Sequence, residues 1–296
     1  MTIAACYINP EGIVLGADST ASAFVHPSGF HYLNHNQKLF EIGIDATLGM
    51  VTWGLGSINM LSHRTQIAIL ADDLKTKPAT TVEEVAKRFA AQVDVEYQKA
   101  YRADVAKFQL LASKLPYDAT AAAANPAARS KDEEQEMQNL WLGLSLGFCI
   151  GGFILPDRIP SAFTVQFDPF KNAPIVAPVT GAAQFWGAPK IFDRLIKGYD
   201  PELRQAIISS GKWSGSHNEL DVILHNLELS HLMLPIRDAV DFIHVCIYTT
   251  IKAMKFSVMS QTCGGPIELA TITTDRKFRW VRHKNWDSAI LDGDIR

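Results

Sequence analysis

The stretch Thr2-Ile-Ala-Ala-Cys-Tyr-Ile-Asn-Pro-Glu-Gly-Ile-Val-Leu-Gly-Ala-Asp18-Ser19 contains two short apolar runs joined by an Asn-Pro-Glu-Gly turn. Such a turn favours a β-hairpin, so the stretch predicts antiparallel strands over residues 2–8 and 12–18. The hairpin brings its two ends together, with a threonine at one end and an aspartate at the other. Thr2 directly follows the initiator methionine, so removing one residue would leave a hydroxyl and a free α-amine on the same residue.

Thr2, Asp18 and Lys38 are candidate catalytic residues because their chemistry is complementary. A hydroxyl is a poor nucleophile unless a base takes its proton, and an N-terminal threonine carries its own base, an α-amine with a pKa of about 8. A nearby lysine would lower the pKa of that amine, and an aspartate would hold the lysine in place. On spacing alone an alternative stays open, in which these are an ordinary second residue, a turn residue and a solvated strand lysine.

Composition sets the broad class of the protein. The chain has 296 residues, of which 47% are apolar and 20% charged, as expected for a globular protein of one large domain or two small ones. A net charge of −3 gives no electrostatic reason to expect nucleic acid or a membrane surface as partner. Without a signal peptide, an apolar run of about 18 residues or Cys-x-x-Cys spacing, we expect a cytoplasmic protein whose four cysteines are buried free thiols.

The order of the remaining elements indicates an α+β fold. Alternating and apolar runs predict strands at 37–42, 46–54, 142–154, 161–167, 174–180, 267–273 and 278–281. Helical spacing predicts helices at 57–75, 80–111, 183–197, 201–209, 217–230 and 236–255, the first two starting at Ser57 and at a Thr80/Glu83 capping box. We expect loops at 21–36, an exposed insertion of loop and helix at 113–139, and a short tail from about 283. Because strands and helices do not alternate, the pattern favours two antiparallel sheets covered by helices in a single domain.

Several stretches, in chain order, resemble the β subunits of proteasomes. They are Thr2 to Ser19, Lys38-Leu39-Phe40-Glu41-Ile42, Gly49-Met50-Val51-Thr52-Trp53-Gly54-Leu55-Gly56, Cys149-Ile150-Gly151-Gly152, Thr180-Gly181 and Cys263-Gly264-Gly265-Pro266-Ile267-Glu268-Leu269-Ala270. The chain is thus similar to a bacterial-type, proteasome-like N-terminal nucleophile (Ntn) hydrolase. This resemblance implies a four-layer α-β-β-α sandwich, a self-assembled homo-oligomeric ring, and a threonine-type peptidase acting on peptides or unfolded proteins without a cofactor or metal.

The same resemblance implies roles for individual residues. The Gly54 N–H would form the oxyanion hole, and Ser22 would hold an extended substrate backbone. The first specificity pocket would be lined by Ala21, Thr52 and Gly56. No residue of the sequence identifies an unfoldase partner for such a ring.

Two positions depart from the family pattern and keep two alternatives open. A serine after the Thr-Gly turn and an aspartate before the Ser-Gly-Gly turn support the nucleophile in active β subunits, and Ala182 and Ser260 stand there in this chain. Nearby Gln184, Ser257 or Cys263 could substitute for them. The alternatives are a non-catalytic ring subunit and an amidase of the same superfamily that acts on a small molecule.

Other motifs carry weaker signals. His26, His31 and His35 lie close together in the loop after Asp18, but their spacing suits no familiar metal site. His217, His225 and His231 flank a predicted helix and are read as surface or interface residues. The segment 143–147 has the outline of a Gly-x-Ser-x-Gly nucleophile elbow, but it lies in an apolar strand without the strand-turn-helix transition that the elbow requires.

Overall fold

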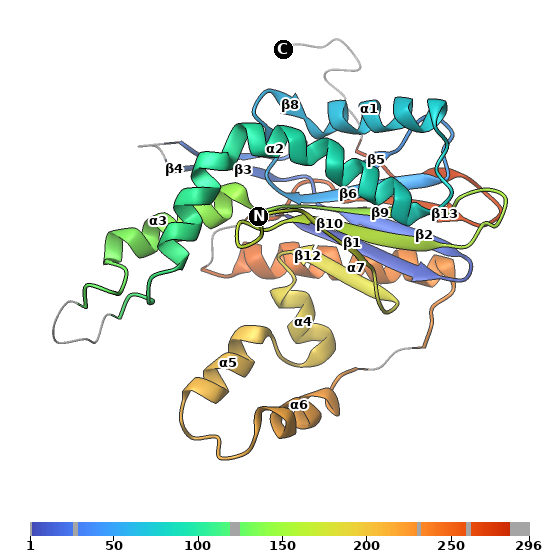
Figure 1. The fold of residues 1–296 in the computed structure, drawn as a ribbon. Helices are drawn as coiled ribbons and strands as arrows, with labels where there is room; N and C mark the ends of the chain where they lie inside the picture. The colour runs from blue at the N-terminus through green and yellow to red at the C-terminus, as the bar shows by residue number, and fades with distance from the viewer. Residues whose placement is uncertain (1, 26–28, 119–124, 230–231, 259–261, 285–296) are drawn as a thin grey trace, which may run out of the picture. The chain divides into compact units, whose positions relative to one another are not determined.

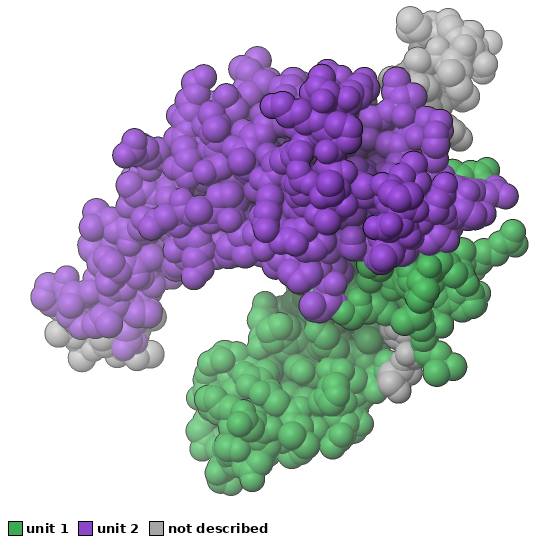
Figure 2. Space-filling model, turned by 45° about the vertical axis from the view of Figure 1, so that its right-hand side comes forward, with its two compact units in different colours: residues 1–39, 181–271, 279–296 green, residues 40–180, 272–278 purple. Residues whose placement is uncertain are grey.

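The computed structural model describes residues 2–25, 29–118, 125–229, 232–258 and 262–284. The chain divides into two compact units (Figure 2). Unit 1 comprises the described parts of Met1–Leu39, Gly181–Thr271 and Arg279–Arg296, and unit 2 comprises those of Phe40–Thr180 and Ile272–Phe278. Each unit carries helices on an antiparallel sheet, which confirms the predicted α+β class with two such sheets. The four-layer stacking and the single domain stay predictions.

The sheet of unit 1 is built on the hairpin at the start of the chain. Its strand order is β12-β1-β2-β13-β14. The strands are β1 (Ile3–Asn9), β2 (Gly12–Ala17), β12 (Ala183–Gly187), β13 (Glu268–Thr273) and β14 (Phe278–Arg282), with the β13–β14 turn grouped in unit 2. In the first turn, the Asn9 side-chain oxygen accepts hydrogen bonds from the backbone N–H groups of Glu11 (2.9 Å) and Gly12 (3.0 Å). These contacts confirm the first predicted hairpin and explain its register, in which Ala4 lies opposite Ala17.

A long helix, α7 (Ile236–Phe256), covers one face of this sheet (Figure 1). It packs directly over Gly16, where an added Cβ would lie 2.6 Å from Ile243 and 2.9 Å from Ile247. The contact buries alternate residues of β1, Ile3, Ala5 and Tyr7, together with the apolar face of the helix. A side chain at position 16 would push the helix away, so the glycine in β2 is required by this close approach.

Strand β12 corrects the prediction of a helix over residues 183–197. Ala183–Gly187 pairs antiparallel with β1, and the helix, α4 (Lys190–Lys197), begins only after Pro189. Gly187 has a φ of +85°, and an added Cβ there would lie 1.9 Å from the Thr2 carbonyl oxygen. Residues on both sides of this break are apolar, which hid the change from strand to helix in the periodicity. Two further helices, α5 (Pro201–Ser209) and α6 (His217–His225), follow as predicted, although α6 ends before residue 230.

The sheet of unit 2 has the strand order β11-β10-β9-β6-β5. Its strands are β5 (Leu39–Glu41), β6 (Leu48–Gly54), β9 (Leu146–Gly152), β10 (Ser161–Phe167) and β11 (Ile175–Pro178). Helices α1 (His63–Thr76) and α2 (Val82–Ala112) lie over it, and α2 contacts β9, β10 and β11. The core between them includes Phe89, whose ring packs edge-on against Phe148 at 4.9 Å between centroids.

Several predicted boundaries in unit 2 are wrong by a few residues. Helix α1 is capped by Ser62, not by Ser57, because Ser57–Ile58 (β7) and Leu61–Ser62 (β8) form a small hairpin. Helix α2 is capped by Thr81, one residue later than predicted. The predicted insertion helix is longer than expected: α3 (Lys131–Leu144) includes residues assigned to a strand, so β9 starts at Leu146.

In unit 1, residues 21–36 are not simply a loop. Ala21–Val25 (β3) and Gly29–Leu33 (β4) form a two-stranded antiparallel ribbon in which Ser22 lies opposite Tyr32. The mix of Ser, His and Asn concealed this pairing, since it lacks the clear alternation of a half-buried strand. His26, and the tail after residue 284, lie outside the described residues.

The four cysteines, Cys6, Cys149, Cys246 and Cys263, are buried free thiols, as predicted. Among the helices of the described ranges, none is both long and apolar enough to cross a membrane.

Candidate active site

Asp18 is the centre of the hydrogen-bond network at the open end of the first hairpin. Its side chain is completely buried, and one carboxylate oxygen, Oδ1, accepts from the Ile3 N–H (3.1 Å) and from Lys38 Nζ (2.6 Å). The other oxygen, Oδ2, accepts from the N–H groups of Thr20 (3.3 Å) and Gly264 (2.9 Å). A buried carboxylate needs a countercharge and donors for its lone pairs, and Asp18 has both.

Lys38 is the countercharge, and it is almost as deeply buried as Asp18. Its side chain is 4% exposed, and besides the aspartate it donates to the backbone carbonyl of Thr20. It lies one residue before β5, so the short strand fixes its backbone. The ammonium is therefore held by a full negative charge and a carbonyl dipole at a buried position.

Thr2 lies beside this ion pair at the start of β1. The backbone N–H of the next residue, Ile3, shares the oxygen Asp18 Oδ1 with the lysine ammonium. The Thr2 carbonyl is packed against Gly187 of β12, and the residue as a whole is 5% exposed. The structure thus brings Thr2, Asp18 and Lys38 together within unit 1. The link between Thr2 and the ion pair runs through the Ile3 N–H, which binds the same carboxylate oxygen as the lysine ammonium.

Cys263 lies close enough to Asp18 and Lys38 for both charges to affect the pKa of its thiol. The pKa of its thiol is raised to about 12, mainly by burial and in part by the negative charge of Asp18, and the positive charge of Lys38 opposes this rise. The thiol therefore stays protonated at neutral pH. Since the thiolate is the nucleophilic form of cysteine, the raised pKa does not favour Cys263 as a nucleophile, and its role as a substitute supporting residue stays a prediction.

The second wall of the predicted site is only partly described, because Ser260 lies outside the described residues. Ala182 contributes a backbone carbonyl, which accepts from the Ile8 N–H at 2.8 Å. Of the possible substitutes, Gln184 pairs opposite Cys6 in the sheet, and the Ser257 hydroxyl donates to the Met254 carbonyl at the end of α7.

Gly54, the predicted oxyanion donor, belongs to unit 2, where it ends β6. Its φ is +83°, and an added Cβ would lie 2.2 Å from the Ser145 carbonyl oxygen, so both its conformation and its surroundings require glycine. The next N–H, that of Leu55, donates to the same carbonyl at 3.0 Å. The turn is therefore rigidly held, and its partnership with Thr2 stays a prediction.

The predicted substrate-binding residues are divided between the units. Ala21 and Ser22 start β3 in unit 1 and are half-buried. In unit 2, the Thr52 hydroxyl donates to the Gly147 carbonyl at 3.2 Å and its residue is 3% exposed, whereas Gly56 is exposed. Thr52 is thus already engaged in its sheet, so its contribution to a pocket stays a prediction.

His63, which the sequence did not single out, holds the turn after Gly54. Its Nε2 lies 2.7 Å from the Leu55 carbonyl oxygen and must carry the proton of that hydrogen bond, which leaves Nδ1 unprotonated. The ring is 4% exposed and packs edge-on against Phe148. A histidine at the first position of a helix gives no sequence signal for such a role.

Lowering the pH below about 6.5 is expected to destabilise the protein through His63. Burial lowers the pKa of this imidazole, although its hydrogen bond to Leu55 partly opposes the effect. The unfolded chain then binds a proton more readily than the folded one, so the contribution of His63 is present above about pH 6.5 and is lost as the pH falls toward its folded-state pKa.

Thermal unfolding at pH 7.5, 6.5 and 5.5 measures this effect. The melting temperature of the wild type should fall between the first and last pH by more than that of His63→Gln, which keeps a donor for the Leu55 carbonyl. His244→Gln is the control for the other histidine whose pKa is lowered, by partial burial and by Arg282. Parallel curves for wild type and His63→Gln would argue against the assignment.

Solved structures include proteins that are similar to this chain, whereas comparisons of sequence found no match. No family model matches the chain, and no curated protein matches it. Among solved structures, the Anbu (Gly-1) mutant from Hyphomicrobium sp. strain MC1 aligns over 99% of this chain and 94% of that one, with 12% sequence identity and a TM-score of 0.49.

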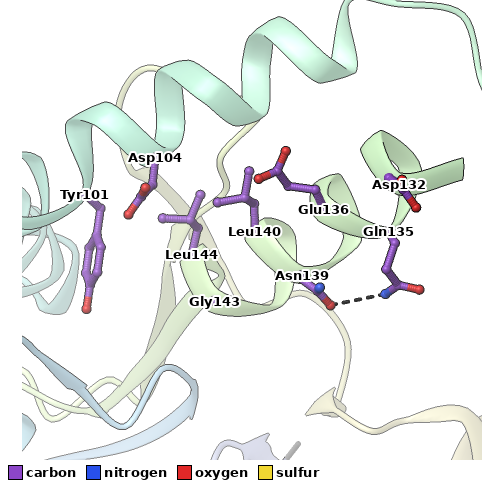
Figure 3. Close-up of a pocket in the computed structure, with 9 residues that line it drawn as sticks. All are labelled: Tyr101, Asp104, Asp132, Gln135, Glu136, Asn139, Leu140, Gly143 and Leu144. Atoms are coloured by element: carbon purple, nitrogen blue, oxygen red, sulfur yellow. Dashed lines mark hydrogen bonds between the residues drawn. The ribbon is translucent and has the colours of Figure 1, made fainter. Parts of the chain in front are cut away.

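A surface groove of about 480 Å³ lies between α2 and α3 of unit 2 (Figure 3). Carboxylates of Asp104, Asp132 and Glu136 line it, and Glu136 is neutralised by an ion pair with Lys107. The two amides in the groove, Gln135 and Asn139, hydrogen-bond to one another. In the part of the chain that the structure describes, no group of three or more His, Cys, Asp or Glu side chains could hold a metal ion.

Proposed function

We propose that this protein is a threonine-type amide hydrolase, a peptidase whose nucleophile is Thr2 after removal of the preceding Met1. The observation that carries the proposal is the buried Asp18–Lys38 pair, which shares a carboxylate oxygen with the backbone of the residue after Thr2. Burying two charges costs free energy, and replacing such a pair by apolar residues often stabilises a protein. An ammonium fixed at the start of β1 is therefore better explained by chemistry on Thr2 than by stability.

In the proposed reaction, the Thr2 hydroxyl attacks the scissile carbonyl carbon while its proton passes to the α-amine. Collapse of the tetrahedral intermediate breaks the C–N bond, and the α-ammonium gives its proton to the departing amine. Water then hydrolyses the acyl-enzyme ester, with the α-amine as base, and this step regenerates Thr2. Lys38 favours the neutral, proton-accepting form of the α-amine, since a nearby positive charge disfavours a second one.

The other proposed roles follow from the sequence resemblance. The Gly54 N–H stabilises the oxyanion, a contribution that typically amounts to a hundredfold or more in rate (roughly 10² to 10³). Ser22 holds the substrate backbone, and Ala21, Thr52 and Gly56 line the first specificity pocket. We further propose that the chain assembles into a homo-oligomeric ring and acts on peptides or unfolded proteins. Light scattering tests the assembly, because a stable monomer would instead favour an amidase with a small substrate.

The decisive covalent fact is the identity of the first residue of the protein in the cell. Intact mass and N-terminal sequencing of protein purified from cells are expected to show a chain that begins at Thr2. A chain that keeps Met1 has no free α-amine on Thr2, and this result would contradict the proposal. It would instead favour the non-catalytic ring subunit, which the alanine at position 182 also favours, since Ala182 offers no side-chain hydroxyl.

A further inference from the structure

A second buried carboxylate, that of Glu268, lies in β13 and takes no part in the proposed reaction. It is completely buried, and its sequence neighbours Ile267 and Leu269 are also buried, with exposed fractions of 4% and 3%. One oxygen, Oε2, accepts from Lys284 Nζ at 3.2 Å, and the other, Oε1, lies 2.7 Å from His283 Nδ1. An acidic side chain in an apolar strand costs free energy unless it is paired, and both partners come from the residues that follow β14.

Lys284 connects this carboxylate to the segment that carries the proposed catalytic lysine. Its ammonium also donates to the backbone carbonyl of Asn36 at 3.0 Å, two residues before Lys38, and its side chain is 13% exposed. The N–H of Asn36 donates in turn to the Ser19 carbonyl at 3.0 Å, next to Asp18. Asn36 is thus bound at its carbonyl by Lys284 and at its N–H by Ser19, which follows the first hairpin.

Gly264 and Gly265, which precede Glu268 in the chain, contact Asp18 and the residues next to it. The Gly264 N–H donates to Asp18 Oδ2, and the Gly264 carbonyl accepts from the Ser19 N–H at 3.0 Å. Gly265, with a φ of +69°, lies so close to the Asn34 carbonyl that an added Cβ would be 2.5 Å from its oxygen. Gly264 and Gly265 therefore lie against both ends of the loop between Asp18 and Lys38.

We propose that Glu268 and Lys284 are positioning residues for Lys38: Glu268 fixes the Lys284 ammonium, and Lys284 fixes residues 34–38 at the Asn36 carbonyl. The inference rests on the proposed function for its catalytic consequence, but the structural part concerns only contacts within unit 1. Loss of either residue releases the loop, so that Lys38 is held by Asp18 and Thr20 alone. The positive charge then moves relative to the α-amine of Thr2, and the pKa of that amine rises.

The catalytic test compares Glu268→Gln and Lys284→Met with the wild type over pH 5.5–9 on a fluorogenic peptide. We expect kcat/KM to fall by about tenfold to a hundredfold with the loss in kcat, and the acidic limb of the profile to move to higher pH. Lys284→Arg should restore much of the wild-type profile. Lys277→Met is the matched control, because it removes an exposed lysine of the β13–β14 turn that is paired with Asp45. It should change neither kcat/KM nor the position of the acidic limb.

Hydrogen exchange of the intact protein tests the positioning without using activity. Backbone amides in residues 34–39 should exchange about tenfold faster or more in Glu268→Gln and Lys284→Met, and at the wild-type rate in Lys277→Met. Unchanged exchange in both variants would overturn the inference. Faster exchange in variants that are active and whose acidic limb has not moved would show that Glu268 and Lys284 stabilise the fold without positioning Lys38, and this result would also overturn the inference. If activity does not depend on Thr2, the proposed function fails separately, and the exchange result alone decides whether the pair holds the loop.

Discussion

Thr2→Ala is expected to abolish peptide hydrolysis while leaving the fold intact. The substitution removes the nucleophilic oxygen but keeps the α-amine, the β1 backbone and the Ile3 N–H that binds Asp18. Loss of a nucleophile that acts together with its base typically lowers kcat by roughly 10⁴-fold or more. The measurement is kcat/KM for the wild type and the variant on a panel of fluorogenic peptides, after mass spectrometry has shown that each chain lacks Met1.

Two further variants make this result specific. Thr2→Ser keeps both a hydroxyl and an α-amine, so it should retain measurable activity. Thr250→Ala removes a different buried hydroxyl of unit 1, one that donates to the Cys246 carbonyl within α7, and should leave kcat/KM close to that of the wild type. Equal activity of wild type and Thr2→Ala would reject Thr2 as the nucleophile, whatever the oligomeric state.

Local chemistry explains which parts of the fold could be predicted from the sequence. The β1–β2 hairpin is determined by its own turn, where the Asn9 side chain accepts hydrogen bonds from two backbone N–H groups. The strand at 278–282 could also be predicted, because a short connection joins it to the strand before it. Strand β12 could not be recognised because, in the described part of the chain, it lies at the edge of its sheet and pairs with β1, nearly 180 residues earlier in the sequence. Its five residues have no period of their own that distinguishes them from the start of the helix after Pro189.

In the candidate site too, contacts between residues close in sequence could be predicted, and contacts between distant residues could not. Thr2 and Asp18 could be paired from the hairpin, and Lys38 was added through its resemblance to a lysine-bearing strand. In the structure Lys38 binds Asp18, and the N–H of the residue after Thr2 binds the same carboxylate, while the catalytic role of the three stays a prediction. The structure also shows contacts that no sequence pattern predicts. His63 supports a carbonyl eight residues before it, and Lys284 reaches Asn36 across 248 positions of sequence. Such contacts depend on how whole strands and helices pack, so single-sequence reasoning could not find them.

Lys38→Met is expected to lower both activity and stability, in contrast to Thr2→Ala, which lowers activity alone. Removing the ammonium leaves the completely buried Asp18 carboxylate with backbone donors only, and breaking one side of a buried ion pair typically costs about 3–5 kcal/mol. Chemical denaturation measures this loss. Activity per folded molecule should also fall, because the α-amine of Thr2 then lacks the neighbouring charge that keeps it unprotonated near neutral pH.

The double variant Asp18→Asn/Lys38→Met separates the ion pair from its surroundings. If the destabilisation comes from an unpaired charge, the double variant should be more stable than Lys38→Met alone, giving a coupling energy in the range of about 0.5–3 kcal/mol. Its activity should stay low, because neutralising Asp18 restores stability but returns no positive charge to Thr2. Lys277→Met, whose ion pair with Asp45 is exposed, should leave the denaturation midpoint unchanged. A double variant that recovers stability and activity together would show that Lys38 serves the fold and not the reaction.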